Sequence, residues 1–115
     1  MFNVVSGLVL HGEGITTLAS AATWQLPGED VGPFEITGSA TVTSLTLPSG
    51  IVQGGRVVMF YGGTSAAVVF TNTNDTTTAG QMDLGGANIT ISDQDVLVLM
   101  QKNNGTWIRL FNTNN

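Results

Sequence analysis

The chain has 115 residues, of which 42% are hydrophobic and only 10% are charged; its formal net charge is −5 and it has no cysteine. About 25% of the residues in an average soluble domain are charged, so the shortage of charge is the feature to explain. The hydrophobic content excludes a disordered chain, and the length predicts one domain over residues 1–115. The scattered Arg56, Lys102 and Arg109 argue against binding to nucleic acid or to a membrane, and the lack of cysteine excludes disulfides and thiolate zinc sites.

The sequence favours β-strands throughout, because it is rich in valine, threonine and glycine and holds few of the runs from which helices are built. Clusters of Gly, Pro, Asn and Asp separate the strand-like segments at the spacing of a sandwich or barrel. The predicted strands are, in chain order, Asn3–Leu10, Ile15–Ala19, Thr23–Leu26, Phe34–Thr37, Thr41–Leu47, Arg56–Tyr61, Ala66–Thr71, Gln81–Leu84, Asn88–Ile91, Val96–Gln101 and Thr106–Asn112.

Two hairpins are predicted from their turn residues. The segment Lys102–Gly105 contains Asn-Gly, the favoured pair for a type I′ turn, in which both central residues need a positive φ. The segment Gly62–Ser65 is expected to play the same part between its two flanking strands.

Some predicted strands are apolar on both faces. The run Val96–Met100 shows no alternation, and Arg56–Tyr61 is similar. In the last strand, strict alternation places Trp107 and Phe111 on one face together with Arg109. Since a chain of this size has one core, strands of this kind indicate oligomerisation, with coverage by a loop as the alternative.

Few side chains are available for chemistry. His11, the one imidazole, is interpreted as a turn or partner-contact residue. The segment Ser92–Asp95 offers oxygen ligands for calcium, but the EF-hand pattern is absent, and a turn whose first two residues bond their own backbone explains it equally well. Glu29 and Asp30 are expected at a loop tip rather than as an acid/base pair. We therefore expect no catalytic residues, no metal site, no cofactor and no enzymatic activity.

The aromatic side chains suggest one alternative. Trp and Tyr can stack on the apolar faces of sugars, and Trp24 and Tyr61 are the candidates for a glycan contact. Trp107 lies in an apolar strand and is expected in the core or in an interface.

Several segments, in this order, resemble a domain of tailed-bacteriophage virion proteins, found in tail and head fibres and in small capsid-decoration proteins. The likeness covers residues 15–112 and departs from the family pattern at Asn72, where the family often has His, and at Ser92–Asp95, where it often has Ala-Gly-Asp. The segments that carry it are Ile36–Leu45, Gly54–Phe60, Ala67–Thr71, Leu84–Ile89, Val96–Gln101 and Gly105–Trp107.

The resemblance implies an all-β, antiparallel, jelly-roll-like β-sandwich that forms a homotrimer. Because the chain is little more than the module, we expect a decoration, or cement, protein made in the host cytoplasm. It would bind the capsid exterior and bridge subunits of the major capsid protein, without nucleic acid, membrane or cofactor. Residues 1–10 are a possible partner-binding arm, with Phe2, Asn3, Val4 and Val5 as candidate capsid contacts through edge addition; equally, they form the first strand of the domain's own sheet. A receptor- or glycan-binding fibre module is the alternative function.

Overall fold

The computed structural model describes residues 4–5, 8–9, 15–27 and 33–114. In these residues the chain is all-β, as predicted, with no α-helix and one short 3₁₀ turn, η1 (Pro48–Gly50). None of the described residues forms a helix with the length and hydropathy that crossing a membrane requires.

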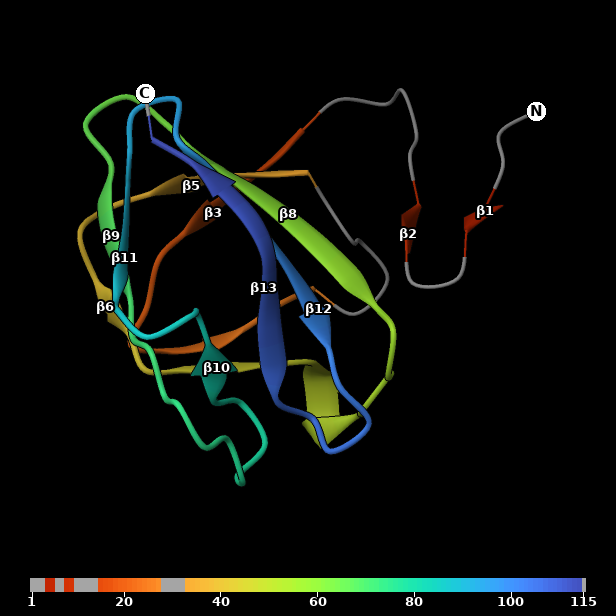
Figure 1. Cartoon of the computed structure of the whole chain (residues 1–115). Helices are drawn as coiled ribbons and strands as arrows, with labels where there is room; N and C mark the ends of the chain where they lie inside the picture. Colours follow the sequence, from red (N-terminus) through yellow and green to blue (C-terminus); the bar gives the residue numbers. More distant parts are fainter. Residues whose placement is uncertain (1–3, 6–7, 10–14, 28–32, 115) are drawn as a thin grey trace.

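The largest sheet has six strands, and two smaller sheets face it across the core (Figure 1). Its strand order is β10 (Met82–Asp83), β13 (Trp107–Thr113), β12 (Val96–Gln101), β8 (Val57–Gly62), β5 (Phe34–Thr37) and β3 (Thr16–Ala19). The smaller sheets are β11 (Ile89–Ser92), β9 (Ala67–Phe70) and β6 (Thr41–Val42), and the pair β4 (Thr23–Gln25) and β7 (Ser44–Thr46).

Strand pairing is mixed, so the prediction of a purely antiparallel fold is wrong. β5 pairs in parallel with both β3 and β8, while β4 with β7 and β6 with β9 are parallel as well. The chain leaves the six-stranded sheet after β3 and crosses one smaller sheet at β4, and it leaves again after β5 and crosses both smaller sheets at β6 and β7. Each time it returns in the same direction, which is the connection that parallel strands require. Within the six-stranded sheet the antiparallel block is β8, β12 and β13, and the edge strand β10 joins β13 in parallel. In the three-stranded sheet, β9 and β11 also pair antiparallel.

The predicted hairpin at Gly62–Ser65 is wrong, because β8 and β9 belong to different sheets. The Gly62 N–H donates to the Asp95 carbonyl and the Gly62 carbonyl accepts from the Gln94 N–H, at 2.9 Å each, so the end of β8 stays with the β12 side. A Cβ at Gly62 would collide with the carbonyl of Ser92, which explains the glycine. The segment therefore turns a corner between sheets.

The predicted strand Thr41–Leu47 is likewise divided between two sheets, as β6 and β7. The N–H of Thr43 donates to the Ala22 carbonyl at 2.8 Å, so this residue bonds to the segment before β4 and ends the pairing of β6. A backbone that changes its partner within one residue cannot continue as a single strand in one sheet.

The hairpin at Lys102–Gly105 is confirmed, with a different turn type. The Gly105 N–H donates to the Lys102 carbonyl at 3.0 Å, and the Lys102 N–H donates to the Thr106 carbonyl at 2.7 Å. Gly105 has a φ of 84°, whereas Asn104 is not among the residues with positive φ. This is the longer loop that combines a type I turn with a glycine bulge. The Asn104 Oδ1 accepts bonds from the Thr106 N–H and hydroxyl, which holds the Asn in the turn.

The N-terminal segment forms a separate hairpin. β1 (Val4–Val5) pairs antiparallel with β2 (Leu8–Val9), so the predicted single strand Asn3–Leu10 is wrong. Among the described strands, neither β1 nor β2 pairs with a strand of the other sheets. The alternative prediction, that this segment is the first strand of the domain's own sheet, is therefore not observed.

The buried residues form one cluster between the six-stranded sheet and the two smaller sheets. Trp24 of β4 stacks on Phe60 of β8 with ring centroids 5.5 Å apart, and Phe70 of β9 lies 5.5 Å from Phe60. Trp107 is fully buried, as expected for a core position, and its Nε1–H donates to the Leu45 carbonyl at 2.7 Å. Aromatic packing and this bond both help to connect the layers.

Trp107→Phe is expected to destabilise the fold by about 1–3 kcal/mol more than Trp24→Phe, since it leaves the buried Leu45 carbonyl without its donor. Both substitutions shrink an indole to a phenyl ring in the same core, so their difference isolates the hydrogen bond. Urea unfolding of the two variants measures it. Equal losses of unfolding free energy would contradict this role of the indole N–H.

Candidate interaction surface

The side of the six-stranded sheet that faces away from the core is largely apolar over β8, β12 and β13. Alternate residues point inward, including the fully buried Val58, Phe60, Leu97 and Leu99. The residues between them form what we call the outer face. Its members are Val57, Met59, Tyr61, Val96, Val98, Met100, Ile108 and Phe111.

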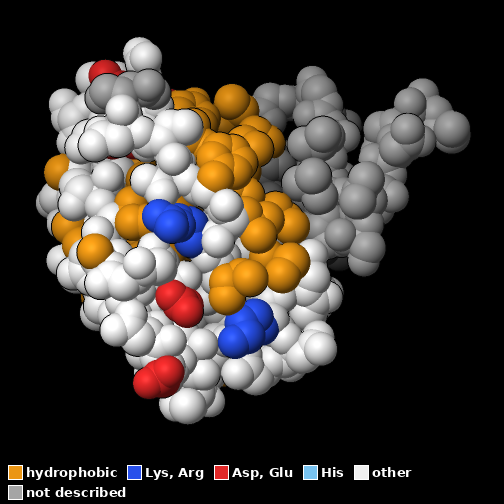
Figure 2. All heavy atoms as spheres, in the orientation of Figure 1, with side chains coloured by type: hydrophobic (Ala, Val, Ile, Leu, Met, Phe, Trp, Pro, Cys, Tyr) orange, Lys and Arg blue, Asp and Glu red, His pale blue; other side chains and the backbone are white. Residues whose placement is uncertain are grey.

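Cross-strand register orders these side chains into rows. Met59 of β8 pairs with Val98 of β12, which pairs with Phe111 of β13, and Met100 pairs with both Val57 and Ile108. Figure 2 shows hydrophobic side chains gathered over this part of the molecule. The prediction that β8 and β12 are apolar on both faces is confirmed, because one side fills the core and the other forms the outer face.

A β-bulge shapes the centre of the outer face. Val98 pairs with Phe111 and Leu99 with Arg109, so Leu110 is an extra residue in β13. The bulge reverses the alternation predicted for the last strand, and Phe111 does not share the side of Trp107. Leu110 and Phe111 are 47% and 49% exposed, an unusual degree for two adjacent large apolar side chains in mid-strand. We call this pair the knob.

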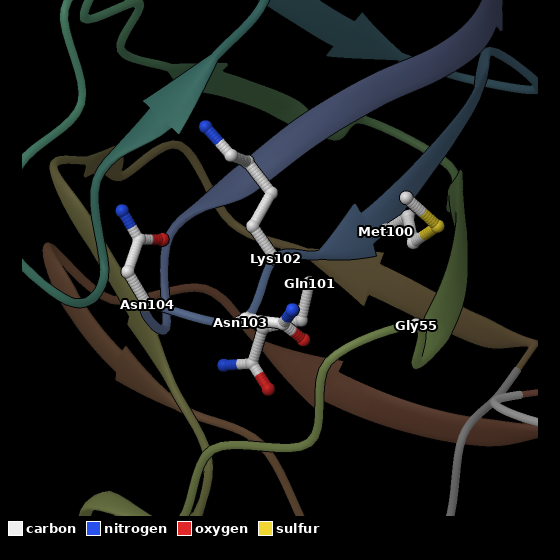
Figure 3. A pocket seen from close by; sticks show the side chains of 6 residues that line it. All are labelled: Gly55, Met100, Gln101, Lys102, Asn103 and Asn104. Atoms are coloured by element: carbon white, nitrogen blue, oxygen red, sulfur yellow. The ribbon is translucent and has the colours of Figure 1, made fainter.

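A shallow depression of about 410 Å³ adjoins the outer face where β12 ends. Met100 belongs to both features, and in Figure 3 Met100 and Gly55 lie to one side of the depression and Asn104 to the other. The residues that line it are Gly55, Met100, Gln101, Lys102, Asn103 and Asn104.

The wall of the depression is held by the buried amide of Gln101. Its Oε1 accepts from the Gln53 N–H at 2.7 Å, and its Nε2 donates to the Gly105 carbonyl at 3.5 Å. The guanidinium of Arg56, 4% exposed, donates from Nη1 to Gln53 Oε1 at 2.8 Å. These bonds tie the loop before β8 to the β12–β13 turn, so the depression has a fixed shape.

A polar cluster lies at the other end of β8. The Tyr61 hydroxyl donates to Glu35 Oε2 at 3.0 Å, and the Thr17 hydroxyl donates to Glu35 Oε1 at 3.1 Å. Partial burial raises the pKa of Tyr61 above its ordinary value, and the hydrogen bond to the Glu35 carboxylate and its charge raise that pKa further. Both Glu35 oxygens therefore have a donor within the same chain.

Tyr61 is the only tyrosine of the chain, so phenolate absorbance reports its ionisation alone. We expect a titration midpoint above about 10, falling toward the ordinary value in Glu35→Gln, which removes the charge but not the burial. Thr17→Val retains the Glu35 charge and is the matched control, with a midpoint that does not fall. A wild-type midpoint at or below the ordinary value would contradict this geometry.

The sign of the effect on stability follows. The folded chain holds the phenol proton more tightly than the unfolded chain, so this contribution to stability is present below the unfolded pKa of Tyr61, about 10, and is lost as the pH rises through the raised folded pKa. The additional loss of folding stability at high pH should be absent in Tyr61→Phe.

The glycan candidates do not come together as an exposed pair. Trp24 is only 5% exposed and packs between Phe60 and Phe70, so it does not offer the exposed ring that a glycan contact requires. Its alternation in β4, where Thr23 and Gln25 are the exposed residues, directs the indole inward. Tyr61 lies on the outer face beside Glu35.

The other candidate residues lie in turns or outside the described residues. Phe2, Asn3, His11, Glu29 and Asp30 fall outside, and of Val4 and Val5 only the strand pairing is described. The Ser92–Asp95 turn is confirmed, although Asp95 rather than Asp93 provides the carboxylate, accepting from the Ser92 N–H at 2.9 Å. Within the described residues, no three acidic or histidine side chains group in a way that could hold a metal ion.

Asn72, at the position where the resembling family often has His, organises a loop instead. The side-chain Oδ1 of Asn72 accepts hydrogen bonds from the backbone N–H groups of Leu84 and Gly86 at 2.8 and 3.3 Å. The backbone N–H of Asn72 donates to Asn88 Oδ1 at 2.8 Å. The side chain fixes the segment between β10 and β11, which is a structural role.

Sequence reasoning missed the knob and the depression. The exposed Leu110 depends on a bulge, for which the strand carries no glycine signal, and the depression depends on two loops that only the fold brings together. Comparisons with protein-family models, curated proteins and solved structures found no match. Function is therefore inferred from the surface of this chain.

Proposed function

We propose that this chain is a structural virion protein of a tailed bacteriophage. As a homotrimer it binds the outer surface of the capsid and stabilises the shell by bridging subunits of the major capsid protein. The observation that carries the proposal is the outer face, an apolar surface on the central strands of a chain with only 10% charged residues. The resemblance of residues 15–112 to virion modules supports the same class, and a jelly-roll-like sandwich is part of the proposal.

Bridging suits a chain of this composition. Burying apolar surface stabilises a contact by about 25 cal/mol per Å², without needing charged partners. Three attachment points in one trimer multiply modest individual contacts, because the second and third bind at a high effective concentration. Few charges also leave such contacts insensitive to salt, since there is little for ions to screen.

Three of the described acidic side chains serve structural roles, which supports binding rather than catalysis. Asp95 caps the Ser92 N–H, Asp83 Oδ1 accepts from the Gly85 N–H at 3.0 Å, and Glu35 is bonded to Tyr61 and Thr17. The proposal accordingly assigns the chain no enzymatic activity and no cofactor.

We place the capsid contact at the N-terminal arm, with Phe2, Asn3, Val4 and Val5 as its residues. β1 pairs with β2 on one side, which leaves its other edge as the candidate for strand addition to a capsid protein. An isolated two-stranded hairpin is only marginally stable in water, so a third strand from a partner would stabilise it.

Purified particles test the proposal. We expect the chain on the capsid exterior in cryo-EM maps, and we expect particles stripped of it to release their DNA at a lower temperature. Adding back the chain should restore the release temperature, whereas a chain without residues 1–5 should not bind. Finding the protein only at the tail, or absent from the virion, would overturn the proposal.

The fibre-module alternative keeps only Tyr61 of its two aromatic candidates, since Trp24 is in the core. A glycan array compares wild type with Tyr61→Phe. A hit that this substitution abolishes, together with absence from the capsid, would establish the alternative.

A further inference from the structure

We infer that the Asn104–Gly105 peptide, in the turn that joins β12 to β13, is a deamidation site that the folded turn keeps closed. Water converts the amide of Asn104 to a carboxylate, with release of ammonia, only while the turn is open. The pair is the only Asn-Gly in the chain, and this chemistry does not depend on the proposed function.

The reaction needs no partner other than water. The Gly105 nitrogen loses its proton and bonds to Asn104 Cγ, the Cγ–Nδ2 bond breaks, and Nδ2 leaves as ammonia with a proton from water. Water then opens the resulting five-membered succinimide at one of its two carbonyl carbons, which gives aspartate or an isoaspartyl linkage through the side chain. Glycine favours the first step, because no Cβ crowds the attacking nitrogen. The two reacting groups belong to adjacent residues, so no encounter is required.

Solvent reaches one reacting group of the folded chain and not the other. The Asn104 side chain is exposed on one side of the turn (Figure 3), whereas Gly105 is buried. Water can therefore receive the leaving ammonia, but the attacking nitrogen is shielded.

Hydrogen bonds also hold both reacting groups. The Gly105 N–H donates to the Lys102 carbonyl at 3.0 Å, and this bond must break before the nitrogen can lose its proton. The Gly105 carbonyl accepts from the Gly80 N–H at 3.0 Å. The Asn104 Oδ1 accepts from the N–H and the hydroxyl of Thr106 at 3.1 and 2.6 Å, which fixes the amide that would be attacked.

Backbone conformation and packing oppose closure of the succinimide ring. Asn104 occupies the second central position of a type I turn, where ψ is about 0°. Closure requires a rotation that brings the Asn104 Cβ into line with the Gly105 nitrogen, and this rotation moves Gly105. A Cβ at Gly105 would lie 2.9 Å from Ala79 Cβ and 3.0 Å from Val52 Cγ2, so the backbone there has little room to move. Deamidation of the folded chain therefore requires local opening, and its rate is the open-chain rate multiplied by the open fraction.

The two products differ in their effect on the turn. An aspartate at position 104 can still accept both hydrogen bonds from Thr106. An isoaspartyl linkage instead adds one atom to the backbone between two paired strands. It would displace the Gly105 carbonyl from Gly80 and from the amide of Gln101, which holds the wall of the depression. The modification would thus alter the surface beside the outer face.

Peptide mapping by mass spectrometry, after prolonged incubation at mildly alkaline pH, tests the site. Arg56, Lys102 and Arg109 are the only Lys or Arg residues, so trypsin yields a short peptide, residues 103–109, that contains Asn104 and, for comparison, Asn103. We expect Asn104 to be the first asparagine to react. Its rate in the folded chain should be about 10-fold or more below its rate in guanidinium chloride at the same pH.

Two substitutions of Thr106 test how the turn is kept closed. Thr106→Val removes the hydroxyl that bonds to Asn104 and keeps the shape of a buried side chain, while Thr106→Ser keeps the hydroxyl and is the matched control. Folded Thr106→Val should deamidate about 2- to 10-fold faster than wild type. Thr106→Ser should stay near the wild-type rate. In guanidinium chloride all three rates should agree, because residue 106 lies outside the reacting pair.

Several results would overturn the inference. They are equal rates in folded and unfolded wild type, another asparagine that reacts first in the folded chain, a folded Thr106→Val no faster than wild type, or a Thr106→Ser that accelerates equally. Blue-shifted fluorescence of the buried Trp24 and Trp107 verifies that each variant is folded, and the wild-type comparison decides if Thr106→Val is not. None of these rates decides whether the chain is on the capsid, so the particle experiment tests the proposed function separately.

Discussion

The fold depends on aromatic packing across a core that no single sheet could enclose. Phe60 of β8 contacts the rings of Trp24 and Phe70, which come from the two different small sheets. Trp107 adds a hydrogen bond to the Leu45 carbonyl, so the six-stranded sheet is connected to β7 by one directional contact. Sheets of two and three strands are marginal alone, and their burial against the larger sheet stabilises all three.

That core uses one side of β8, β12 and β13 and leaves the other side apolar. A strand with no alternation must place hydrophobic side chains on both faces of its sheet. The outer face therefore follows from a choice of residues that the core by itself does not require. The shortage of charge noted in the sequence is what the proposed function predicts, because a surface that other chains cover would have little need of solvating groups.

Local sequence patterns predicted which segments form strands better than they predicted which strands pair with one another. The β12–β13 hairpin was predictable because its turn and both strands are adjacent in the chain. The corner at Gly62 was not, because it results from bonds to Gln94 and Asp95, some thirty residues later. Trp24 was misplaced for a related reason, since its burial depends on Phe60 and Phe70, in strands far along the chain.

The sequence by itself determined the all-β class, the segments that form most of the strands, the burial of Trp107 and the apolar character of β8 and β12 on both faces. These properties are local, set by residue type and by the period of two along a strand. Only the tertiary structure decided the mixed pairing, the division of Thr41–Leu47 between two sheets, the knob and the depression. Each of these depends on which distant backbone groups complete a hydrogen bond, and the local sequence does not encode that choice.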